Sequence, residues 1–183
     1  MWNRKKKADS AEERRAAEYV TAEEFCEIFR RDMKPLYTVA LLLTASPEKA
    51  EQSFVDALDD CRRARVFRNW EQSWSRLAVI ESAMRIVKPL QTKGFAYEKE
   101  NALESDPGVK SGILPIFRLN GFDRFVFVLS VLGRYSVRDC AILLKCAWRE
   151  VDEARRRAID FFAEGVRPIL ATPPMGLSSS IQL

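Results

Sequence analysis

Residues 135–162 constrain the fold of this chain more than any other segment. Ser136, followed by Asp139 three positions later, has the pattern of a capping box that starts a helix. The break at residues 145–147 is too short for anything other than a sharp turn. Apolar residues recur at helical spacing before the turn, at Cys140, Ile142, Leu143 and Leu144, and after it, at Val151, Ala154, Ala158 and Phe161 or Phe162. The segment therefore predicts two helices that meet at a tight angle.

Two helices joined in this way are typical of the helix-turn-helix, whose second helix enters the major groove of DNA while the first crosses the backbone. The basic residues suited to DNA contact are Lys145, Arg149, Arg155, Arg156 and Arg157, in the turn and the second helix. We interpret the three consecutive arginines as contacts to phosphate groups. Arginines near the C-terminus of a helix also complement its dipole, so a purely structural role for them stays open.

Two acidic residues, Asp152 and Glu153, lie in the same second helix where base-reading side chains are expected. Carboxylates are repelled by phosphate, although one can accept a hydrogen bond from cytosine. We therefore include both residues in the candidate DNA interface. The basic surplus of residues 113–183 is modest, with 10 Lys and Arg against 7 Asp and Glu.

The residues before the two helices come in a recognisable order: Leu114 and Pro115, then Arg124, then an apolar run at 125–132, then Tyr135 and Ser136. In this order they resemble region 4, the promoter-binding C-terminal domain, of extracytoplasmic-function sigma factors of the sigma-70 family. Those proteins carry a Leu-Pro pair, an arginine, an apolar run and a Tyr-Ser before their helix-turn-helix.

The first half of the chain resembles region 2 of the same family. Leu36 and Tyr37 form the Leu-Tyr pair of one helix, and Ala50 and Glu51 lie in the next, after a small turn. In the family this second helix docks on the clamp of RNA polymerase. The two resemblances together cover roughly two thirds of the chain, in the right order, as expected for a divergent member.

The resemblance implies a transcription initiation regulator that binds RNA polymerase core and promoter DNA, with an anti-sigma protein as a further partner. The residues that it places on the polymerase are Glu48, Glu51, Gln52, Val55 and Asp56. It also places Trp70 and Arg76 close to the melted DNA strand. Trp74 lies on the apolar stripe of its helix, which favours core packing over base stacking.

A second interpretation belongs to a different class of function. The acidic second helix and the electrically neutral first half are also expected of a sigma-derived protein-interaction module that has lost promoter recognition. A phosphate-contacting protein loses DNA affinity steeply with salt, whereas binding to a protein partner need not.

The pattern of helix starts and stops predicts an all-α fold of two small helical bundles joined by a linker. In the first bundle, Thr21 with Glu24 starts a helix that Pro35 should kink or break near Lys34, and Pro47 and Asn69 mark the starts of two more. In the second, one buried helix is expected from Phe122 to Leu132. The predicted division is a basic arm at 1–20, a region 2-like domain at 21–88, a linker at 89–112, a region 4-like domain at 113–167 and a disordered tail at 168–183.

Composition argues against catalysis and against a metal centre. The chain has no histidine, no glycine-rich phosphate loop and no paired carboxylates framed by apolar residues, so we expect no enzymatic activity, no cofactor and no small-molecule substrate. The four cysteines, Cys26, Cys61, Cys140 and Cys146, form no Cys-x-x-Cys pair, and we expect free thiols without metal. A thiol-based redox or zinc sensor is a third interpretation that rests on these cysteines alone.

No apolar run is long enough to cross a membrane, and the N-terminal residues lack the apolar segment of a secretion signal. We therefore expect a cytoplasmic protein with no membrane partner.

Overall fold

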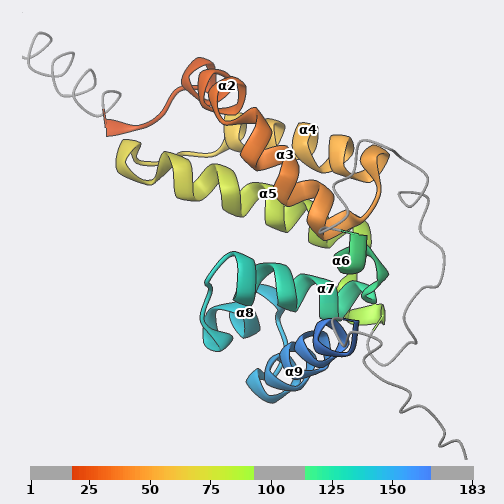
Figure 1. The fold of residues 1–183 in the computed structure, drawn as a ribbon. Coiled ribbons are helices and arrows are strands. Elements are labelled where there is room, and N and C mark those ends of the chain that lie inside the picture. The colour runs from red at the N-terminus through yellow and green to blue at the C-terminus, as the bar shows by residue number, and fades with distance from the viewer. Residues whose placement is uncertain (1–17, 93–113, 166–183) are drawn as a thin grey trace, which may run out of the picture.

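The computed structural model describes residues 18–92 and 114–165, and the regular structure in those ranges is helical (Figure 1). In the same ranges extended pairing is limited to an isolated antiparallel bridge between Tyr19 and Phe67. The predicted all-α fold class is therefore confirmed. The basic arm up to residue 17, the linker from residue 93 and the predicted disordered tail lie outside the described residues.

The first half contains α2 (Ala22–Arg31), α3 (Met33–Thr44), α4 (Pro47–Arg63) and α5 (Glu71–Val87). The predicted capping box starts α2, where the backbone N–H of Thr21 donates to Glu24 Oε2 at 2.8 Å and the N–H of Glu24 donates to Thr21 Oγ1 at 3.2 Å. The predicted break is also confirmed, because α2 ends at Arg31. A continuous helix would bring the Pro35 ring against the Arg31 carbonyl, four residues earlier.

The start of α5 differs from the prediction. Asn69 does not cap this helix, because it lies inside a single 3₁₀ turn, η1 (Arg68–Trp70), and the N-cap position falls on Trp70. The N–H of Trp70 donates to the Phe67 carbonyl at 2.9 Å, which closes that turn. The tight turn therefore replaces the side-chain cap that the sequence suggested.

The second half contains α6 (Leu114–Arg118), α7 (Gly121–Phe127), α8 (Val137–Leu144) and α9 (Trp148–Gly165). The expected apolar helix does run to Leu132, but its last residues, Val128–Leu132, form a π-helical segment, η4. There the N–H of Gly133 donates to the Val128 carbonyl at 2.8 Å, five residues earlier. The helix ends at Gly133, as predicted.

The two halves share a hydrophobic core, which the division into two bundles did not anticipate. Leu43 of α3 and Ile80 of α5 belong to the same buried cluster as Phe122 and Phe125 of α7. A second cluster, around Phe25, lies within the first half. Figure 1 shows the second half below α5. Residues 121–126 of α7 are all buried, because the helix packs one side against α9 and another against α3.

Burial sets the chemistry of the cysteine thiols. Cys61 and Cys140 are fully buried, and desolvation, helped by the adjacent Asp60 and Asp139 carboxylates, raises the pKa of Cys61 to about 12 and that of Cys140 to about 11. Cys26 and Cys146 are partly exposed. Within the described residues no group of three or more potential ligands could hold a metal ion.

We expect iodoacetamide to label the native protein at Cys26 and Cys146 and to spare Cys61 and Cys140, because the thiolate is the reactive form and burial disfavours it. Peptide mass spectrometry after a timed reaction measures this directly. Labelling of all four thiols in urea is the control. Equal native labelling of Cys140 and Cys146 would contradict the described packing.

None of the described helices is both long and apolar enough to cross a membrane.

Candidate nucleic-acid interface and protein-binding surfaces

The helix pair α8 and α9 has the tight turn that the sequence predicts. Ser136 caps α8, with its hydroxyl accepting from the N–H of Asp139 at 3.1 Å while the Asp139 carboxylate accepts from the N–H of Ser136 at 3.2 Å. Lys145 ends α8 in a left-handed conformation, with φ 54° and ψ 46°. Two residues later, the N–H of Ala147 donates to Glu150 Oε2 at 2.8 Å. This bond gives a hydrogen-bond partner to a backbone N–H group at the start of α9.

Buried apolar side chains fix the angle between the two helices. Cys140 and Leu144 of α8 lie in one fully buried cluster with Val151 and Ala154 of α9. This leaves the outer face of the first turns of α9 exposed at Arg149 and Glu153. Among the described residues, the face on which a major-groove interface would have to lie is therefore exposed.

Charges on the outer face of α9 largely compensate one another. Arg156 donates to Asp152 Oδ2 at 2.8 Å, one helical turn away, and both groups are solvent-accessible. The Arg149 guanidinium lies 5.5 Å from the ring centroid of Trp148, which is itself exposed. Glu153 is exposed beside them. This part of α9 therefore has little net positive charge, as the acidic residues led us to expect.

Arg157 has a role that the sequence analysis did not identify. Its Nε donates to Asp123 Oδ2 at 3.0 Å and a terminal nitrogen donates to Asp123 Oδ1 at 2.6 Å. The Asp123 side chain is 1% exposed and the Arg157 side chain is 44% exposed. This two-point ion pair joins α9 to α7. The sequence feature that could have indicated this ion pair is Asp123, because a charged residue within a helix expected to be buried needs a partner.

The three consecutive arginines occupy three different environments. Arg155 is half-buried, and its buried Nε has no hydrogen-bond partner among the described residues. Arg156 is exposed and Arg157 belongs to the ion pair with Asp123. The structure therefore does not present them as one basic surface, and their contact with phosphate stays a prediction.

A hollow of about 490 Å³ lies over the turn between the two helices. Two of its basic residues are exposed, Arg138 near the start of α8 and Lys145 in the turn. The sequence analysis did not select Arg138, although it stands two residues after the helix cap, where the first helix of a DNA-binding pair crosses the backbone. Arg149, which is exposed in the first turn of α9, lies close to this hollow in the sequence and adds a third basic residue around the turn.

The residues expected to contact polymerase share one face of α4. Their spacing places them along a single stripe, at Glu48, Glu51, Gln52, Val55 and Asp56. Val55 is exposed despite being apolar, and Asp56 is partly exposed. The Ser46 hydroxyl donates to Glu48 at 2.6 Å and lowers the pKa of that carboxyl. The stripe is therefore accessible and acidic.

An aromatic groove of about 450 Å³ lies between α5 and α8. Its most exposed apolar residues are Trp70, 59% exposed, Trp74, 41% exposed, and Ile142, 74% exposed. The prediction that Trp74 packs in the core is wrong, because Ser75, Ala78 and Val79 take the inward face of α5. Arg76 lies over the ring of Tyr135 at 5.8 Å, also between the two halves.

No family model and no curated protein sequence matches this chain. Among solved structures, the chain is similar to the sigma factor RpoE from Bartonella quintana, crystallised in complex with the anti-sigma factor NepR. The sequences are 17% identical, the match covers 80% of this chain and 99% of that chain, and the TM-score is 0.46.

Proposed function

We propose that this chain is a sigma-like transcription initiation regulator, with no enzymatic activity, that acts in the cytoplasm. It binds RNA polymerase core through residues 21–88 and duplex promoter DNA through residues 113–167. The observation that supports DNA binding best is the pair α8 and α9, rigidly joined and open on its outer face, with Arg138, Lys145 and Arg149 exposed around the turn.

The positions of these residues indicate which of them contact phosphates and which contact bases. Arg138 and Lys145, at the two ends of α8, reach phosphates on either side of the groove. The residues along the outer face of α9 meet the base edges and the neighbouring backbone: Arg149, Asp152, Glu153 and Arg156. Arg155 is half-buried and lies farther from the DNA than these residues. Because Arg157 is engaged with Asp123, its main contribution is to hold α9 at the correct angle.

The acidic stripe on α4 supports the proposed contact with polymerase core. A helix face with exposed carboxylates and one apolar residue, Val55, suits a basic protein surface with an apolar centre. Trp70 caps the start of α5 and Arg76 lies in the N-terminal half of that helix, and an unpaired base could stack on the exposed indole ring of Trp70. An anti-sigma protein would compete for these same exposed surfaces.

Converting Asp152 to Lys and Glu153 to Ser should raise affinity for duplex DNA by about tenfold or more, because two repulsions are removed and one attraction is gained. Fluorescence anisotropy on labelled duplexes at several salt concentrations measures both the affinity and its salt slope. Changing Asp59 to Lys and Asp60 to Ser in α4 gives a matched control with the same change in net charge. An affinity that does not change relative to this control would mean that α9 does not enter the groove.

A second candidate function is a protein-interaction module of sigma type that has lost promoter recognition. The compensated charges of α9 and the exposed aromatic groove at Trp70, Trp74 and Ile142 favour it. The two functions differ in salt dependence. Binding to promoter DNA should weaken steeply between low and moderate salt, whereas binding of an apolar segment in the groove should hardly change.

A further inference from the structure

The first residue of α9, Trp148, is a large aromatic residue that is 56% exposed. It lines the hollow over the turn together with Ile142 of α8, which is 74% exposed. Single exposed apolar residues are common on protein surfaces, but here two large ones from different helices share one surface. The centre of this hollow is therefore apolar and open to a binding partner.

Arginines border this apolar centre. Arg138 is exposed and lines the hollow, and the described residues that line it include no acidic side chain. A partner with anionic edges and an apolar group between them therefore suits this surface better than a wholly apolar partner. The major groove of DNA has this arrangement, because phosphates border the base edges and thymine adds a 5-methyl group to them.

The orientation of the Trp148 ring is set by its neighbour. The Arg149 guanidinium lies 5.5 Å from the ring centroid, within the distance at which a cation is attracted to the face of an indole. This contact limits the rotation of both side chains, so less side-chain freedom is lost when the ring contacts a partner. The first turn of α9 therefore presents a large apolar group in a defined orientation.

We propose that Trp148 is a specificity residue of the DNA interface and selects thymine by contact with its 5-methyl group. This inference rests on the proposed function, because it requires α9 to enter the major groove. Residues at the N-terminal end of a recognition helix are those that contact base edges. Hydrogen-bonding groups make up most of those edges, so an apolar ring gains most from the methyl group of thymine.

Replacing thymine by deoxyuridine tests the proposal, because it removes the 5-methyl group and leaves every hydrogen-bonding group in place. Selection by the full chain from a library of randomised duplexes supplies a bound sequence, in which the thymines are then replaced one at a time. Fluorescence anisotropy measures the dissociation constant of each duplex. We expect at least one position at which the replacement weakens binding about threefold to fourfold, because one buried methyl group is lost.

Variants assign the effect to one side chain. In Trp148→Ala, thymine and deoxyuridine at that position should give equal affinities, and a repeated selection with this variant should lose the preference for thymine there. Ile159→Ala, at a residue of the same helix that is 43% exposed, should keep the full difference.

The possible failures separate this inference from the proposed function. An unchanged thymine preference in Trp148→Ala, or sequence-selective binding that no deoxyuridine weakens, would overturn the role of Trp148 alone. Failure of the full chain to bind duplex DNA, or binding without any selection of sequence, would overturn both.

Discussion

Replacing Arg157 by alanine should lower the free energy of unfolding by about 2–4 kcal/mol, whereas the same change at Arg156 should cost no more than about 0.5 kcal/mol. The two arginines are adjacent in the sequence and each donates to an aspartate. They differ in the burial of that partner. Asp152 keeps contact with water when Arg156 is removed, but Asp123, at 1% exposure, becomes a buried carboxylate without its cation. The expected loss of stability for Arg157→Ala lies toward the lower end of the range for breaking buried ion pairs, because the Arg157 side chain is 44% exposed.

Urea unfolding followed by tryptophan fluorescence and circular dichroism measures both variants under the same conditions. A double variant, Asp123→Leu with Arg157→Met, separates loss of the pair from loss of packing. It should recover much of the stability lost in Arg157→Ala, because no buried charge remains. Equal effects of Arg156→Ala and Arg157→Ala would contradict the described ion pair.

Replacing Arg124 by methionine should cost about 2–4 kcal/mol, because it removes two charged hydrogen bonds, one across the boundary between the halves and one within the second half. Arg124 is only 5% exposed, and its Nε donates to the Leu43 carbonyl at 3.0 Å while a terminal nitrogen donates to the Leu119 carbonyl at 2.9 Å. Leu43 lies in the last turn of α3, whose carbonyls have no helical partner. Methionine fills much of the same volume, so the loss reports mainly on these bonds.

Amide hydrogen exchange distinguishes a local loss of contact between the halves from a uniform loss of stability. In Arg124→Met the amides of the last turn of α3 and of α7 should lose protection before those around Phe25, which lies in the other cluster. Arg138→Met is the matched control, since Arg138 is an exposed arginine of the same half. A loss of stability no larger than that of this control would mean that Arg124 does not join the halves.

Features set by neighbouring residues were predictable from the sequence. The capping boxes at Thr21 and Ser136, the break before Pro35 and the end of a helix at Gly133 all follow from backbone hydrogen bonding within a few positions. Each of these is confirmed by hydrogen bonds or helix ends that involve residues only a few positions apart.

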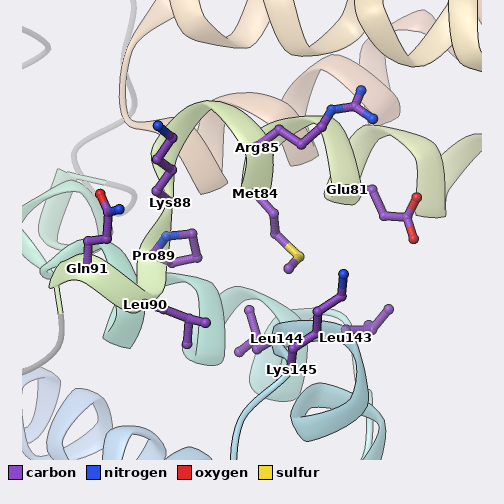
Figure 2. Close-up of a pocket in the computed structure, with 10 residues that line it drawn as sticks. All are labelled: Glu81, Met84, Arg85, Lys88, Pro89, Leu90, Gln91, Leu143, Leu144 and Lys145. Atoms are coloured by element: carbon purple, nitrogen blue, oxygen red, sulfur yellow. The ribbon is translucent and has the colours of Figure 1, made fainter.

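Features set by contacts between distant residues were not predictable. Asp123 and Arg157 are 34 positions apart, and Arg124 and Leu43 are 81 positions apart, so no local pattern pairs them. The exposure of Trp74 depends on which side of α5 packs against the other helices. The apolar stripe of α5 is too broad for the sequence to show which side that is. The aromatic groove and the cavity lined by Met84 and Leu144 (Figure 2) lie between the halves, so they arise only when α5 and α8 come together.

We propose above all that this chain brings polymerase core and promoter DNA together. Core polymerase mixed with the full chain and a library of genomic DNA fragments, then isolated by gel shift and sequenced, tests it most directly. We expect a complex that requires both proteins and is enriched in fragments with a shared upstream motif, and we expect the enrichment to disappear in a variant with Arg138, Lys145 and Arg149 all changed to Ala. Binding to core polymerase without any selection of DNA would contradict the claim.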